Sequence, residues 1–540
     1  MEKKKTFIII VVALLVLSIG ITFAYFIAKT GPGSSANANV TTGTVDDLKF
    51  NVSKENLSIN INQFNFASGA GNLTDTVTAT ASLKANSTKK TATYNYYVYF
   101  QIESNNYMYT TTDKKPEIVL SITGPNGEIT SVDGLKYVSA TNADGTVVKG
   151  FDITEQRTSL IKIADSFEIS STSSTNYTNQ DWIFKVSFIN LDTNQVDNEG
   201  KNLTGKALIQ QEKIITSISD VAKNGDNLVT VIETLGTKGD SSLTGLYHHD
   251  ASLINGARDN SYRFAGGNPN NYVCFGSDEA TCPTENLYRI IGVIDGKVKL
   301  IHADGATTTM LGTNEGYANT YQAAWSGDTS YYKGNGDLTK IGAYKWNKTG
   351  DNTWSTSTTN TTNLNTNYLT YLDGKNIKWK NMIADTTWYV GGMTYNNGSR
   401  SNAKTAYNYE LGANKDATTT VTSKIGLMYV SEYYYGATPG YWPYNSIGVD
   451  YRKATNDNWL YTGLYEWTIS RRSGDSGVAF EVYGDGALRG GGVGDLIGYA
   501  VRPSFSLSSS IKFTSGEGTA VNPIRINLWW GDDACLGRKG

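Results

Sequence analysis

An alternation of apolar and polar side chains, present twice in the first half of the chain, constrains the fold most. Between residues 94 and 103, apolar side chains at every second position share one face, with Asn95, Gln101 and Glu103 opposite. The same alternation recurs between residues 182 and 188. Successive side chains of a strand point to opposite faces, so each segment presents one apolar face to a core. Separated by turn signals such as residues 124–127, these segments predict a β-sandwich.

The composition also predicts mostly β structure. The 540 residues include 35 Tyr, which favours strands, and 55 Gly, which favours tight turns. This length accommodates two or three domains with buried cores. The net charge is −3 and charged residues make up 18% of the chain, so no basic surface for nucleic acid is indicated.

The N-terminal segment predicts export. Lysines occupy positions 3–5, and residues 7–28 that follow are apolar and carry no charge. Such a stretch is long enough to cross ~30 Å of hydrocarbon, and the lysines keep the N-terminus in the cytoplasm. We therefore expect a single-pass cell-membrane protein with its bulk outside, or a secreted protein if a signal peptide is cleaved after Ala24.

Two cysteines are predicted to form a disulfide. Cys274 and Cys282 are eight residues apart in a Pro- and Gly-containing segment, and an exported protein meets an oxidising environment. Two free thiols are the alternative. A zinc site is not expected, because neither a C-x-x-C motif nor a partnered His accompanies them. Cys535 is left without a predicted role.

Local patterns in the second half predict several elements. Residues 228–235 have helical spacing and are followed by Gly236 as a stop, and residues 364–372 have helical spacing and are followed by Gly374. A second short helix is expected near Trp379. Asp295-Gly296 predicts a type I′ hairpin between strands 287–294 and 297–302. Residues 424–429 are expected to form a buried strand.

Six motifs follow one another along the chain in the same order as in a known domain family. They are residues 259–264 (DNSYRF), 268–274 (NPNNYVC), 287–293 (LYRIIGV), 466–472 (EWTISRR), 484–486 (GDG) and 498–505 (GYAVRPSF). This series resembles a bacterial extracellular domain family of unassigned function built on a C-type-lectin-like scaffold. The resemblance covers about residues 243–512 and implies short helices packed on a heavily looped antiparallel sheet. It implies no ligand.

A second resemblance concerns the first part of the chain. Residues 17–26 resemble the export signals of Gram-positive biofilm-matrix fibre proteins, which are processed by a dedicated signal peptidase. That similarity implies a sandwich like theirs in the segment that follows. We therefore expect a mostly β chain with this order of parts: 1–30 transmembrane anchor or signal segment, 31–45 flexible linker, 46–215 β-sandwich domain, 216–242 linker, 243–515 α+β C-type-lectin-like domain, and 516–540 tail.

Aromatic residues predict an interaction surface. The crowded set, interspersed with Gly and Pro, comprises Tyr433, Tyr434, Tyr435, Tyr441, Trp442 and Tyr444. Amphipathic rings on a loop suit contacts with a protein or glycan, whereas packing inside the domain is the alternative. The neighbouring rim is expected to be lined by Arg471, Arg472, Asp475, Arg489 and Asp495. Trp467, Arg502 and Phe505 are expected to be structural.

Metal and cofactor chemistry is not predicted. His248 and His249 are adjacent, so their side chains on a strand point to opposite faces and rarely share an ion. His302 is expected to be a hydrogen-bonded core residue. Residues 268–270 and 456–459 suggest calcium-binding pairs of a lectin, but their placement and order are those of turn formers. No nucleophile elbow, phosphate loop or H-E-x-x-H motif occurs.

These patterns together predict a cell-surface adhesin or recognition protein that binds a protein or glycan without catalysis. The first alternative is a structural component of an extracellular matrix or fibre. A glycan-acting hydrolase is the third interpretation, since paired carboxylates meet only in the folded protein.

Overall fold

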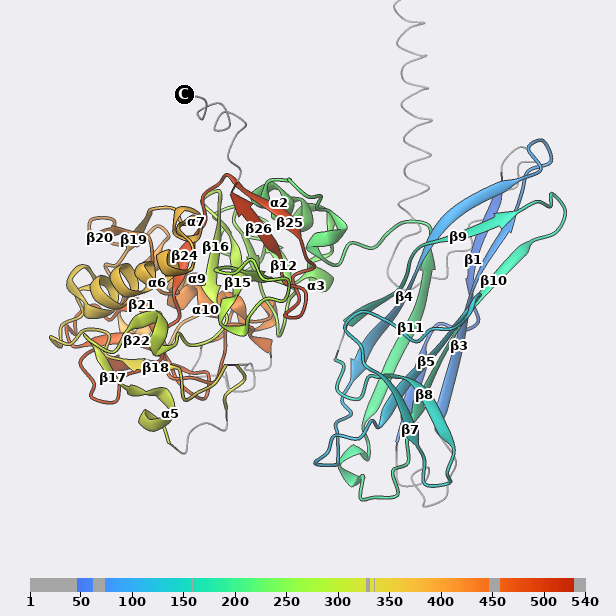
Figure 1. Ribbon diagram of the computed structural model, residues 1–540, viewed down its shortest axis with the longest axis horizontal. Helices are drawn as coiled ribbons and strands as arrows, with labels where there is room; N and C mark the ends of the chain where they lie inside the picture. The colour runs from blue at the N-terminus through green and yellow to red at the C-terminus, as the bar shows by residue number, and fades with distance from the viewer. Residues whose placement is uncertain are drawn as a thin grey trace, which may run out of the picture. The chain divides into compact units, whose positions relative to one another are not determined.

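The computed structural model describes residues 46–61, 73–157, 159–326, 331–334, 336–445 and 457–528. The chain divides into two compact units, unit 1 ending at residue 214 and unit 2 beginning at residue 215 (Figure 1). The described residues are mostly β, as the composition predicted. The predicted membrane segment 7–28, the cleavage position Ala24, the linker 31–45 and Cys535 lie outside them. In the ranges given above, no helix is both long and apolar enough to span a membrane.

Unit 1 consists of two antiparallel sheets. The first has the strand order β1-β3-β10-β5-β8-β7, with β6 paired to β5, and the second has the order β2-β11-β4-β9. The strands of the first sheet are β1 (Asp47–Val52), β3 (Thr74–Lys84), β5 (Ile118–Gly124), β6 (Gly127–Glu128), β7 (Tyr137–Thr141), β8 (Val147–Asp152) and β10 (Thr178–Phe188). Those of the second are β2 (Leu57–Asn60), β4 (Ala92–Asn105), β9 (Ser159–Ser171) and β11 (Asn202–Gln210), with a 3₁₀ turn η1 (Val196–Asn198) before β11.

The two sheets of unit 1 share one apolar core, because the alternating faces of β4 and β10 meet. Phe100 of β4 stacks on Phe184 of β10 with ring centroids 5.6 Å apart. Trp182 donates its indole N–H to the hydroxyl of Tyr96 at 2.9 Å, so the polar atom of each ring is satisfied inside the core. The two alternating segments read from the sequence are therefore strands whose apolar faces are buried together.

Unit 2 is built on a central sheet with the order β12-β13-β15-β16-β24, to which β14 adds by pairing with β15. Its strands are β12 (Leu246–His248), β13 (Tyr262–Phe264), β14 (Tyr272–Cys274), β15 (Leu287–Ile294), β16 (Lys297–His302) and β24 (Ser504–Ser506). The predicted hairpin is confirmed: Asp295 and Gly296 have φ of 50° and 67°, as a type I′ turn requires.

Smaller sheets and short helices surround the central sheet. The smaller sheets pair β17 (Tyr317–Thr320) with β18 (Gly342–Tyr344), β19 (Thr386–Tyr389) with β20 (Thr420–Ser423), β22 (Val478–Val482) with both β21 (Glu466–Arg471) and β23 (Leu488–Gly492), and β25 (Ile511–Ser515) with β26 (Arg525–Leu528). The helices are α2 (Leu228–Lys238), α3 (Ser241–Thr244), α4 (Thr308–Leu311), α5 (Tyr321–Ala324), the π-helix η5 (Thr359–Tyr368), α6 (Leu369–Lys375), α7 (Ile377–Asn381), α8 (Tyr395–Gly398), α9 (Ala403–Glu410) and α10 (Val430–Gly436). The 3₁₀ turns are η2 (Ile218–Asp220), η3 (Thr284–Asn286), η4 (Trp354–Thr356) and η6 (Pro439–Tyr441).

Three sequence expectations about these elements were wrong. Helix α2 runs through Gly236 to Lys238, because this glycine serves packing: a Cβ there would lie 2.4 Å from Tyr262. Helix α6 likewise continues one residue beyond Gly374. Residues 424–429 are buried but form no strand; only Gly426 makes a ladder contact, an isolated bridge to Ser504.

Candidate functional site

Half of the aromatic segment that was predicted to be a surface loop is a buried helix. Tyr433, Tyr434 and Tyr435 belong to α10, which packs against α9, β13 and β21, and each is at most 1% exposed. Their hydroxyls bond to backbone oxygens inside unit 2, that of Tyr434 to Gly398 O at 2.8 Å. The expectation that these three rings form a contact surface was therefore wrong, because the helix is enclosed on several sides.

Trp442 is also a core residue. Its indole N–H donates to the carbonyl of Ala437 at 2.8 Å, and its ring lies 5.3 Å from that of Tyr435. The prediction that Trp442 contacts a ligand was wrong for the same reason, since the side chain has no exposed area. Tyr441 is half-buried and Tyr444 is 46% exposed, so these two remain available as contact residues.

The two predicted rim arginines have different environments. Arg471, at the end of β21, donates its Nε–H to the carbonyls of Val390 (3.1 Å) and Gly391 (3.0 Å), which fixes the chain ahead of α8. Arg472 is 38% exposed, and its Nη1 lies 3.3 Å from Oδ2 of Asp475. Of the pair, Arg472 is the one whose guanidinium faces solvent.

Arg472 and a second arginine both contact a tyrosine ring, and the sequence had singled out neither this tyrosine nor the second arginine. The guanidinium carbons of Arg472 and Arg400 lie 5.4 Å and 5.3 Å from the ring centroid of Tyr395, on α8. The Tyr395 ring is parallel to that of Phe480 of β22, with centroids 6.4 Å apart. We call Tyr395, Arg400 and Arg472 the arginine–tyrosine surface. No spacing rule links positions 395 and 472, which the parallel bridge between Met393 and Arg472 brings side by side.

The remaining predicted aromatic contacts adjoin this surface. Ala403, at the start of α9, donates its N–H to the carbonyl of Trp442 at 3.1 Å. That bond links the segment of Tyr441 and Tyr444 to the segment of Arg400, whereas Arg472 contacts Tyr395, which sequence reasoning missed together with Arg400.

A buried carboxyl lies on the other face of the same small sheet. Glu481 follows Phe480 on β22 and so points the opposite way, between its cross-strand neighbours Trp467 and Arg489. Burial raises the pKa of Glu481 to about 8, and nearby Arg489 and Asp495 act in opposite directions on it. Its Oε2 is enclosed and has no hydrogen-bond partner among the described residues. An enclosed acid of this kind forms no open carboxylate pair for hydrolysis.

Three residues expected to be structural are buried in unit 2. Trp467 donates its indole N–H to Tyr344 O at 2.8 Å, and Phe505 of β24 lies opposite Leu300 of β16. Arg502 donates to the carbonyls of His302 and Leu460, each at 2.9 Å. An arginine here ties carbonyls of distant segments together inside the core.

The histidines serve packing. Nδ1 of His249 accepts the N–H of Ala257 at 3.0 Å, and burial lowers the pKa of this imidazole to about 3. His248 instead stacks on Tyr262, with ring centroids 4.3 Å apart. Both ring nitrogens of His302 contact backbone oxygens. In the part of the chain that the structure describes, no three His, Cys, Asp or Glu residues are grouped to hold a metal ion.

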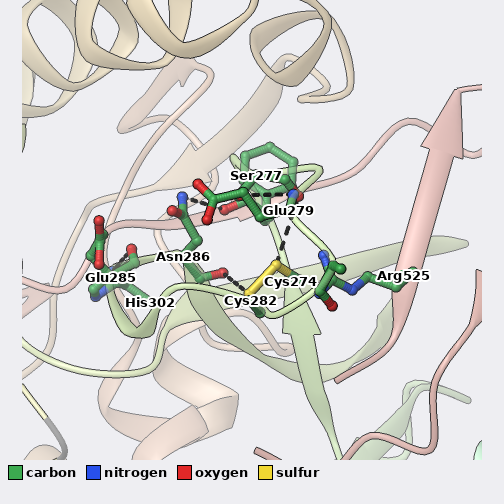
Figure 2. The surroundings of a disulfide bond; sticks show 10 residues. Cys274, Ser277, Glu279, Cys282, Glu285, Asn286, His302 and Arg525 are labelled. Atoms are coloured by element: carbon green, nitrogen blue, oxygen red, sulfur yellow. Dashed lines mark hydrogen bonds between the residues drawn. A yellow bond between two sulfur atoms is a disulfide. The ribbon is translucent and has the colours of Figure 1, made fainter. Parts of the chain in front are cut away.

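The predicted disulfide between Cys274 and Cys282 is confirmed (Figure 2). It joins the end of β14 to the turn that leads into β15. Arg525 of β26 donates to the carbonyl of Ala280 at 2.9 Å, and Asn286 donates to that of Phe275 at 3.0 Å. The small loop is therefore held by a local bond from Asn286 and by Arg525, a residue distant in sequence.

No protein-family model matches the chain, and the search of curated proteins found no match.

Proposed function

We propose that the protein is an exported, cell-surface recognition protein that binds a protein or glycan ligand without catalysis. Residues 7–28 would anchor it in the membrane, the β-sandwich of residues 46–215 would serve as a stalk, and a C-type-lectin-like domain of about residues 243–515 would carry the binding surface. The arginine–tyrosine surface is the observation that carries this proposal.

Three properties of that surface support recognition. Arg400 is exposed and Arg472 is 38% exposed, so their guanidinium groups are reachable from solvent. Both are held against one tyrosine ring, which limits the conformational entropy that binding would cost. Tyr444 adds an exposed amphipathic ring on the adjoining segment, a type of residue common at interaction sites.

The test is binding of the purified protein from residue 31 onward to glycan and protein arrays, with and without EDTA. We expect specific binding that Arg400→Ala and Arg472→Ala each weaken. Arg489→Ala is the matched control, because Arg489 is 37% exposed, pairs with an aspartate and stacks on a tyrosine on the other face of the same sheet. A blank array, with the same protein forming fibres, would contradict recognition and support the matrix alternative.

A further inference from the structure

The arginine–tyrosine surface carries an unmatched positive charge. Arg472 is paired with Asp475, whereas Arg400 makes no ion pair and no side-chain hydrogen bond anywhere in the described ranges of the chain. Its contact within the protein is with the ring of Tyr395, 5.3 Å from the guanidinium carbon. Two arginines thus contact one ring, and among the described residues only Arg472 of the two has a carboxylate partner.

Hydrogen bonds hold the backbone near both arginines that contact the Tyr395 ring. The hydroxyl of Tyr434 holds the carbonyl of Gly398 at 2.8 Å, two residues before Arg400. On the other side, Arg472 donates its N–H to Val478 O at 3.1 Å and accepts from Nδ2 of Asn352 at 3.1 Å. The two guanidinium groups are therefore presented from a pre-organised backbone, as a specific binding site requires.

We propose that Arg400 and Arg472 together bind a carboxylate or phosphate group of an anionic glycan. This inference rests on the recognition function proposed above and names its ligand class. A guanidinium presents N–H donors in a planar fork that matches both kinds of oxyanion. Both guanidinium carbons lie within 5.4 Å of one ring centroid, so the two arginines present their donors around a single tyrosine.

A glycan fits this surface better than an acidic protein does. Protein interfaces are centred on large apolar or aromatic anchors that become fully buried. None of the large apolar side chains that are exposed within the described residues belongs to residues 394–403 or 470–475, the segments that carry this surface. Two arginines on a half-buried tyrosine, with no large exposed apolar anchor in these segments, suit an acidic sugar better than the centre of a protein interface.

The experiment measures affinity of the protein from residue 31 onward for polygalacturonate, a phosphate-bearing polysaccharide, dextran and poly-L-glutamate at two salt concentrations. We expect binding to one or both acidic polysaccharides, little binding to dextran, and weaker binding at higher salt. The two acidic polysaccharides distinguish carboxylate from phosphate as the recognised group. Arg400→Ala and Arg472→Ala should each raise Kd about tenfold or more. Arg400→Lys should fall between the wild type and Arg400→Ala, since it keeps the charge but loses the planar fork.

The control variant is Arg489→Ala, which should leave Kd unchanged, and thermal unfolding should show that all four variants are folded. Equal binding to dextran and the acidic polysaccharides, unaffected by Arg400→Ala, would overturn this inference while leaving recognition standing. Tighter binding to poly-L-glutamate than to either polysaccharide would overturn the glycan assignment. No binding to any polymer would overturn the inference too, and the array would then decide separately whether recognition itself fails.

Discussion

Nη1 of Arg502 lies 3.3 Å from Oε2 of Glu466, and neither side chain is more than 2% exposed. Arg502 also donates to the carbonyls of His302 and Leu460, so one guanidinium joins the end of β16, the loop before β21 and β21 itself. Burial raises the pKa of Glu466 to about 7 in spite of the arginine. Arg502 therefore links the central sheet to the β21–β22–β23 sheet through buried polar contacts.

Replacing Arg502 should strongly destabilise unit 2. Arg502→Met leaves Glu466 and two carbonyls without their donor, and breaking a buried pair in this way typically costs ~3–5 kcal/mol. Urea unfolding followed by tryptophan fluorescence measures the loss. Arg489→Ala, which removes a partly exposed pair with Asp485, should cost less than ~1 kcal/mol. Equal losses for the two variants would contradict the assignment of Arg502 as a core tie.

Glu481 predicts a pH dependence of stability. Its folded-state pKa, raised by burial to about 8, lies above the ordinary value of 4.5 expected in the unfolded chain. Between these values the folded state holds a proton that the unfolded state lacks. The stabilisation is complete below pH 4.5 and is lost as the pH rises through 8, by up to about 5 kcal/mol at 1.36 kcal/mol per pKa unit.

The measurement for Glu481 compares unfolding free energies of the wild type and Glu481→Gln from pH 5 to pH 9. Glu410 and Glu466 titrate in the same range, because burial raises the pKa of each to about 7. The difference in unfolding free energy between the two proteins isolates the contribution of Glu481. Glu481→Gln should become relatively more stable as pH rises, and a difference independent of pH would refute the prediction.

Trp442 and Tyr444, two residues apart, should respond to substitution in different ways. Trp442→Ala removes a fully buried indole and its hydrogen bond to Ala437, so unit 2 should lose ~3–5 kcal/mol. Tyr444→Ala removes an exposed ring and should change stability by less than ~0.5 kcal/mol while weakening ligand binding. Chemical unfolding and array binding of both variants test this; a stable Trp442→Ala protein with lost binding would restore Trp442 as a contact residue.

The disulfide should stabilise unit 2 mainly through the unfolded chain. Cys274 and Cys282 are eight residues apart, for which the chain-entropy model gives ~2–3 kcal/mol. The measurement is unfolding with and without reductant in a Cys535→Ala background. A Cys274→Ala, Cys282→Ala variant in that background is the control, and reductant should leave its stability unchanged. Equal stability of the oxidised and reduced proteins would count against the prediction.

Local signals explain what the sequence could predict. The hairpin around Asp295 and Gly296 was predicted with its strand ends, because a two-residue turn with positive φ fixes its own register. The disulfide loop and the alternating strands of unit 1 are local in the same sense. Gly236 misled because a glycine inside a helix can serve packing, which only its neighbour Tyr262 reveals. At Gly374 a Cβ would meet nothing within 4 Å, and the helix ends one residue later.

The candidate site depends on long-range contacts and was therefore found only in part. The tyrosines of α10 were placed on a surface because composition cannot tell an enclosed helix from an exposed loop. Arg472 was selected from the sequence, but its partners Tyr395 and Arg400 lie more than 70 positions away. Their meeting depends on one parallel bridge, between Met393 and Arg472, for which the sequence carries no periodic signal.

Strand β24 adds to the central sheet beside β16, although some 200 residues separate them, and β25–β26 follows it along the chain. The central sheet of unit 2 therefore stays incomplete until residue 506 has emerged from the ribosome, whereas unit 1 already has all its described strands at residue 210. The two units should consequently mature at different moments during synthesis. For unit 2, β16 is an open edge throughout that interval, and pairing of this edge with the wrong chain is the misfolding route that its topology creates.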